Sequence, residues 1–220
     1  MIAPPLISNK TRILEIAGVI ATAIGKFIVM YHAAWRFPFI ATVSLLWIGY
    51  IIYRSRTCNG ITRYWGFRGD NFKSVLKKVL PFGLVSIIAI FGLGLYQDTI
   101  NISWHIIPIL VLYPIWGVIQ QYLLIALTAG NMQHLAKQNI SNRIIILSTA
   151  LFFAAVHYPY SGLICATFVL ALFYGWIYLH ERNIYVLGLF HGWLGALFYY
   201  IVLGRDPFVE IFGKLTGIAE

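Results

Sequence analysis

Charged residues are scarce in this chain, and acidic residues are the scarcest of them. Only 10% of the 220 residues are Asp, Glu, Lys or Arg, whereas 60% are hydrophobic. Soluble domains contain about 25% charged and about 45–50% apolar residues, so this composition predicts an integral membrane protein. The apolar runs are continuous rather than alternating, which disfavours a β-barrel. We therefore expect an all-α polytopic helical bundle, because helices satisfy the backbone in lipid.

Cysteine is rare as well. Cys58 lies in a basic stretch and Cys165 lies in an apolar run, so we expect no disulfide between them. We also expect no cleavable signal peptide, because prolines and polar residues occupy the first positions. The net charge is +9, but most Lys and Arg residues flank apolar runs, as membrane topology requires. We therefore expect membrane lipids as partners and no nucleic acid.

About seven apolar stretches have the length of transmembrane helices, and we interpret 1–220 as a single integral membrane domain. The first two should form a hairpin that turns at residues 36–38. Lys26 and His32 interrupt the first span, and we expect both to face the bundle or to reach the interface. The fifth span is short, so its end at His157 should break inside the membrane. The predicted spans are 13–34, 37–53, 81–97, 104–128, 144–156, 163–179 and 184–203.

The polar stretch 54–78 sets the expected topology. It carries seven Lys and Arg residues and one acid, Asp70. By the positive-inside rule, we expect this stretch and the N-terminus to be cytoplasmic, in a multi-pass protein of the plasma or inner membrane. Residues 70–80 predict a separate amphipathic helix on the membrane surface, capped by Asp70 or Asn71.

Two adjacent carboxamides, Gln120 and Gln121, lie near the middle of the fourth predicted span. Burying an amide without partners costs about 2–7 kcal/mol, so we expect polar partners for both. His157 and His191 are the best candidates, since each lies in an otherwise apolar segment. At about 1.5 Å per helical residue, Gln120, His157 and His191 fall at similar depths in a hydrocarbon core about 30 Å thick. These four residues therefore predict one polar pocket at mid-membrane, with no cofactor.

Such a pocket is compatible with several functions. Buried Gln and His side chains can simply hold helices together. A histidine can act as a general base near pH 7, with carboxamides orienting water or stabilising an oxyanion. Two imidazoles could bind a metal ion, but a third strong ligand is missing, so we expect no metal. A proton relay would need a membrane-embedded acid, whereas the seven acids are predicted in loops, at span ends or in the C-terminal tail.

The order of these residues resembles the CPBP family, the intramembrane endopeptidases related to CAAX prenyl endopeptidases and bacteriocin-processing proteins. That family carries EExxxR, then FxxxH, then His followed four residues later by Asn. Here the segment Phe153–His157 (FAAVH) matches the second motif, His191 matches the third, and the resemblance covers roughly residues 60–203. The resemblance implies intramembrane peptide cleavage, candidate catalytic residues Gln120, Gln121, His157 and His191, and a membrane peptide or a prenylated or lipid-linked substrate.

The chain also departs from the family pattern. Gln120 and Gln121 replace the two Glu residues, Ile125 replaces the Arg, and Gly195 replaces the Asn. The family mechanism uses the first Glu to activate water, and a carboxamide cannot accept that proton. The sequence is therefore compatible with two functions. One is an intramembrane hydrolase with a histidine base, and the other is an inactive pseudoprotease that binds a membrane peptide or lipid-linked ligand as a scaffold or regulator.

Overall fold

The computed structural model describes residues 7–29, 33–135 and 140–217. Within these ranges the chain forms helices and no β-strand, which confirms the all-α prediction. His32 lies outside the described residues. The helical elements are α1 (Asn9–Val29), α2 (Ala33–Thr57), α3 (Ile61–Trp65), α4 (Phe72–Gln97), α5 (Ile106–Gln121), the π-helix η1 (Tyr122–Ala126), α6 (Ala129–Met132), α7 (Asn142–Ala155), α8 (Ser161–His180), α9 (Ile184–Ile201) and α10 (Pro207–Thr216).

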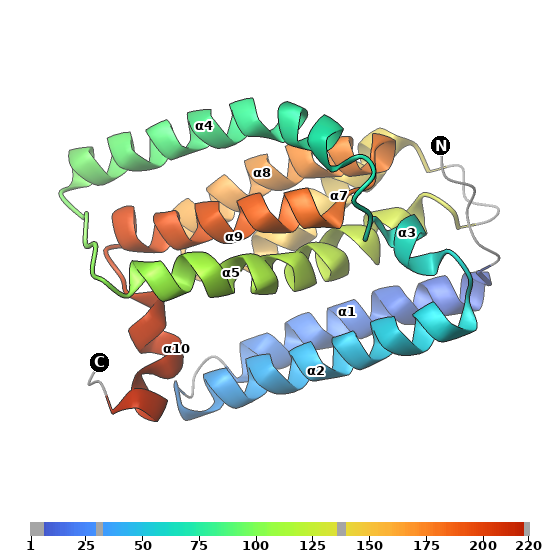
Figure 1. Ribbon diagram of the computed structural model, residues 1–220, viewed down its shortest axis with the longest axis horizontal. Coiled ribbons are helices and arrows are strands. Elements are labelled where there is room, and N and C mark those ends of the chain that lie inside the picture. Colours follow the sequence, from blue (N-terminus) through green and yellow to red (C-terminus); the bar gives the residue numbers. More distant parts are fainter. Residues whose placement is uncertain (1–6, 30–32, 136–139, 218–220) are drawn as a thin grey trace.

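The long helices run side by side along one direction (Figure 1). At the centre, α5 packs closely against α9, and α4 covers another side of α9. The helices α7 and α8 form a second closely packed pair, and α1 and α2 form a hairpin along the other side of the bundle. The short helix α10 lies across one end, where it contacts α2 and α5.

Five stretches of the described chain are long and apolar enough to cross a membrane. The polytopic membrane architecture is therefore confirmed, but the seven predicted crossings are not. The helix α1 carries Arg12, Glu15 and Lys26, and α7 has only 14 residues. The five candidate spans are Trp35–Thr57, Phe72–Gln97, Ile106–Met132, Ser161–His180 and Ile184–Ile201.

Two predicted helix boundaries at prolines are wrong. The turn predicted at residues 36–38 lies inside α2, which contains Pro38. The amphipathic helix predicted for residues 70–80 is continuous with the following span, because α4 runs through Pro81. Val75 and Val79 on this helix are fully buried in the protein instead of facing a lipid surface. Helices in membranes tolerate proline because neighbouring groups and small local adjustments satisfy the freed backbone carbonyl.

Glu15 belongs to a buried polar cluster near the start of α1. It is 4% exposed, and its carboxylate accepts hydrogen bonds from the Tyr50 hydroxyl at 2.6 Å and from Asn131 Nδ2 at 2.7 Å. Arg54 lies 3.8 Å from the same carboxylate, and Arg12 Nη1 donates to Asn131 Oδ1 at 3.2 Å. The charge of Glu15 is therefore satisfied locally, and this carboxylate ties α1 to α2 and α6.

Asp206 stabilises the end of the bundle opposite to the Glu15 cluster. Its carboxylate accepts hydrogen bonds from His105 Nδ1 at 2.7 Å and from the hydroxyls of Ser103 and Tyr200, each at 2.8 Å. It also caps α10 by accepting from two backbone N–H groups. Burial alone would raise the pKa of Asp206, but these hydrogen bonds outweigh burial and hold it below its ordinary value.

The closest contact between helices is made by glycines of α5 and α9. A Cβ atom added to Gly117 would lie 2.2 Å from the carbonyl oxygen of Gly188. A Cβ added to Gly188 would lie 2.4 Å from Val118 Cα, and one added to Gly192 would lie 2.5 Å from Pro114 N. Gly188 and Gly192 are four residues apart, the spacing of small residues that lets membrane helices approach backbone to backbone. This approach lets side chains on either side of the glycines reach across the contact between the two helices, which run in opposite directions (Figure 1).

Candidate functional site

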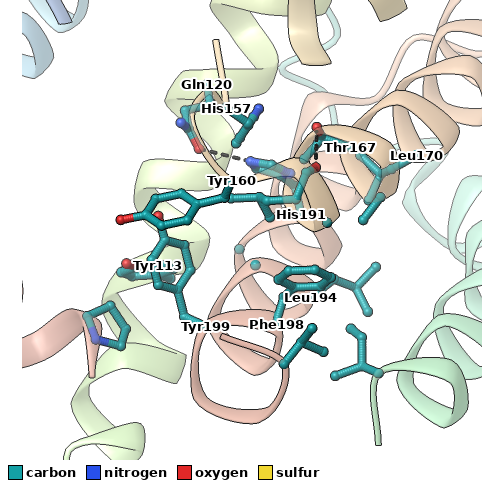
Figure 2. A pocket seen from close by; sticks show the side chains of 18 of the residues that line it. Tyr113, Gln120, His157, Tyr160, Thr167, Leu170, His191, Leu194, Phe198 and Tyr199 are labelled. Atoms are coloured by element: carbon teal, nitrogen blue, oxygen red, sulfur yellow. Dashed lines mark hydrogen bonds between the residues drawn. The ribbon is translucent and has the colours of Figure 1, made fainter. Parts of the chain in front are cut away.

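Gln120 and His191 meet across the α5–α9 contact. Each lies one helical turn beyond a glycine of that contact, Gln120 after Gly117 and His191 after Gly188. The distance from His191 Nε2 to Gln120 Oε1 is 2.9 Å (Figure 2). Because the carboxamide oxygen accepts, His191 donates from Nε2 and holds its lone pair on Nδ1. The predicted hydrogen bond to a neighbouring span is thus present for Gln120, whereas the polar partner expected for Gln121 is not found among the described residues.

His157 follows α7 and is oriented by the backbone of that helix. Its Nδ1 donates to the carbonyl oxygen of Phe153 at 2.7 Å, so the neutral ring carries its lone pair on Nε2. The ring of Phe153 stacks on His157 and meets His191 edge-on, with both centroid distances at 5.2 Å. The two imidazole centroids are 6.2 Å apart. The FxxxH segment therefore does two things: the ring of Phe153 packs against both histidines, and its carbonyl fixes the tautomer of His157.

The structure does not bring Gln121 to this group. Adjacent residues on a helix point about 100° apart, so Gln120 and Gln121 cannot share one face. Gln121 is fully buried, and neither polar atom of its amide has a hydrogen-bond partner among the described residues. The group that converges is therefore Gln120, His157 and His191.

These three residues line a cavity of about 810 Å³. Ligand pockets typically measure about 300–1,000 Å³ and have apolar walls with a few polar groups. Figure 2 shows Gln120, His157 and His191 gathered together, with Leu194 and Phe198 farther along the wall. The cavity therefore has the size of a ligand site and combines apolar walls with a few polar groups.

Lys26 is a cavity residue whose role the sequence did not indicate. It comes from α1, and its ammonium donates to the backbone carbonyl of Val156, the residue before His157. Of the two orientations expected for Lys26, toward the bundle or toward the interface, the side chain adopts the first. Nothing in the order of the motifs links α1 to the end of α7, so only the tertiary structure places this cation beside the histidine.

No carboxylate pairs with Gln120, His157 or His191 among the described residues. Glu210 lines the cavity, but it is bonded to Arg205 and lies 3.9 Å from Arg36. Within the described ranges, no group of three or more His, Cys, Asp or Glu side chains is placed to hold a metal ion. The site consists of an amide, two imidazoles and a nearby ammonium.

Residues 104–197 match the protein family described as type II CAAX prenyl endopeptidase Rce1-like. The matched segment contains Gln120, the FxxxH segment and His191. This match supports membership of the CPBP family. Neither the curated proteins nor the solved structures gave a significant match.

The positions at which the chain departs from the CPBP pattern have distinct surroundings. Ile125, in place of the family's Arg, is fully buried in the π-helix and does not line the cavity. Gly195, in place of the Asn, does line the cavity, and a Cβ there would meet no atom within 4 Å. The cavity therefore has empty space beside Gly195.

Proposed function

We propose that this CPBP-family membrane protein binds a membrane-embedded peptide or a lipid-linked ligand in the cavity beside Gln120 without cleaving it. The observation that carries the proposal is the hydrogen bond from His191 to the Gln120 oxygen. A glutamate there could take a proton from water, whereas a neutral amide oxygen cannot serve as that base. Glu210, the carboxylate in the cavity wall, is held by arginines, so it does not replace the missing group.

The dimensions of the site support binding. The cavity reaches from the Gln120 group toward Arg36 near the start of α2 and Gln97 at the end of α4. Both of these positions lie at the end of the bundle away from α3 (Figure 1). If the basic stretch 54–78 is cytoplasmic, as we propose from its charge, the cavity occupies the half of the membrane that faces away from the cytoplasm.

Hydrolysis by a histidine base is a second candidate, favoured by one specific observation. With Nδ1 of His157 donating to Phe153, the opposite ring nitrogen can accept a proton. The Gln120 amide nitrogen could then donate to a developing oxyanion. In this alternative His157 is the base, and Gln120 and His191 orient the reacting groups.

A binding and cleavage assay separates these functions. The purified protein in a neutral detergent is titrated into a fluorescent prenylated peptide, binding is followed by anisotropy, and products are analysed by mass spectrometry. We expect binding without cleavage, and we expect Gln120→Leu to weaken it about tenfold, the loss of one hydrogen bond. Gln121→Leu is the matched control, because it removes the same amide from the same helix outside the cavity.

Three results would contradict the binding proposal. Cleavage that is abolished by His157→Ala would instead assign the hydrolase function. Cleavage that survives both His157→Ala and His191→Ala would rule out this cavity as the active site. Binding that Gln120→Leu and Gln121→Leu weaken equally would show that the peptide does not occupy the cavity.

A further inference from the structure

The polar end of the cavity carries a positive charge from Lys26. The ammonium sits at the carbonyl end of α7, where it donates to Val156 O. A helix C-terminus has a partial negative charge equivalent to about half an elementary charge, so it compensates a cation only in part. An ammonium has three N–H donors, and the Val156 carbonyl uses one of them. Lys26 therefore retains donors and net charge for another partner.

The described acids do not neutralise Lys26. None of their carboxylates lies within 4.0 Å of its ammonium, the distance within which the ion pairs of this chain are found. Glu210 is engaged by Arg205 and Arg36, and Glu15 is engaged by Tyr50 and Asn131. A lysine inside a membrane bundle is costly unless it is paired, and such residues commonly mark ligand pathways.

The neighbouring polar groups also suit an anion. The oxygen of Gln120 is occupied by His191, which leaves the amide N–H₂ group as a donor. His157, with Nδ1 bonded to Phe153, presents one ring nitrogen that can take up a proton and become a further donor. Donors thus outnumber acceptors at this end of the cavity.

The cavity wall along α4, α8 and α9 is mostly apolar, and the charged residues Arg36 and Glu210 lie elsewhere in the lining. This apolar wall has side chains suited to a hydrocarbon chain, including Ile90, Leu93, Leu163, Leu170, Leu194 and Phe198. In Figure 2 the labelled Leu170, Leu194 and Phe198 lie away from Gln120 and His157. The Lys26 group therefore selects a charge, and the apolar wall of α4, α8 and α9 accommodates an acyl-like chain.

We propose that Lys26 and Gln120 bind the anionic head group of a single-chain amphiphile, with a carboxylate as the simplest head, while the chain lies along the wall of α4, α8 and α9. This inference rests on the proposed binding function and specifies the charge of the ligand. The site requires an anion attached to hydrocarbon, whether the anion is the carboxylate of a fatty acid or the phosphate of a lipid.

The test compares palmitate, hexadecyl phosphate and hexadecanol as probes for the purified full-length protein in a neutral detergent. Palmitate and hexadecyl phosphate are charged and hexadecanol is neutral, whereas all three have the same chain length. We expect palmitate to bind at least about tenfold more tightly than hexadecanol, the effect of one charge-assisted hydrogen bond. We expect Lys26→Met to weaken palmitate binding much more than hexadecanol binding and so to remove this preference. Hexadecyl phosphate binding as tightly as palmitate would assign a general anion site, and weaker binding would assign a carboxylate site.

Lys10→Met is the matched control, because Lys10 is an exposed lysine of the same helix outside the cavity. Equal affinities for palmitate and hexadecanol, or palmitate affinity that Lys26→Met and Lys10→Met change equally, would overturn the inference. If the prenylated peptide still binds in a Gln120-dependent way under those results, the proposed binding function survives without the anion site. If neither the peptide nor any of the three amphiphiles binds, the proposed function itself fails.

Discussion

The glycine contact between α5 and α9 gives the sharpest prediction, the effect of Gly188→Ala. The new Cβ atom would lie 2.4 Å from Val118 Cα and 2.6 Å from Val118 N. Non-bonded carbon atoms are optimally about 3.5–4.0 Å apart, so the helices would have to separate locally by about 1 Å. Both obstructing atoms belong to the backbone, so no side-chain rotation can relieve the contact. The Gln120–His191 hydrogen bond, 2.9 Å long and one turn away, should break.

The loss of folding stability caused by Gly188→Ala can be estimated from three contributions. Overpacking costs about 1–3 kcal/mol, and loss of the Gln120–His191 hydrogen bond costs about 0.5–1.5 kcal/mol. The higher helix propensity of alanine offsets this loss of stability by about 1 kcal/mol. The net expectation is a loss of about 0.5–3.5 kcal/mol, and domains of this size shift their melting temperature by about 2–4 °C per kcal/mol.

Thermal unfolding of the purified protein in detergent measures this effect. Gly195→Ala is the control, because it lies on the same helix and its Cβ would meet nothing within 4 Å. We expect the control to melt at the wild-type temperature or slightly above it, and Gly188→Ala to melt several degrees lower. Equal melting temperatures for the two variants would refute the backbone-to-backbone packing of α5 and α9, and with it the account of how Gln120 reaches His191.

Three further predictions use simpler measurements. Gln120→Glu alone should not produce efficient peptide cleavage, because Ile125 and Gly195 still replace the family's Arg and Asn; abundant product in a mass-spectrometric assay would contradict this. Cys58 should resist a membrane-impermeant thiol reagent added outside intact cells, and efficient labelling would reverse the proposed topology. The pKa of Asp206 is lowered in the folded protein, so its stabilising effect is present above the ordinary value of 3.8 and lost as pH falls below it. The melting temperature of wild type should therefore fall more steeply with acidification than that of Asp206→Asn, and parallel curves would contradict this.

The sequence predicted the Gln120–His191 meeting because depth along a helix follows from residue count alone. It could not separate Gln120 from Gln121, since the rotation of a helix about its axis depends on packing. In this fold the rotation is set by Gly117, Gly188 and Gly192, whose role becomes visible only when the two backbones are in place. In a uniformly apolar helix, hydrophobic periodicity gives no signal that distinguishes Gln120 from Gln121.

Several other features of the structure depend on tertiary contacts that local sequence signals do not reveal. Pro38 and Pro81 suggested helix ends, but both lie inside continuous helices. Lys26 interrupted an apolar run, and its partner at Val156 is 130 residues away in the chain. Glu15 lay near the start of the first predicted span, as expected, but its burial among Tyr50 and Asn131 depends on helices that pattern analysis cannot position.

The shortness of α7 has a consequence for the surrounding bilayer. Its 14 residues rise about 21 Å at 1.5 Å per residue, which is about 9 Å less than a hydrocarbon core about 30 Å thick. A helix too short for its membrane is accommodated by local thinning of the bilayer or by polar groups that reach toward the interface. Local thinning beside a helix of this length would bring the lipid surface closer to the turn that carries His157. A molecule dissolved in that leaflet would then have a shorter lateral path to the cavity and would not first have to pass into water.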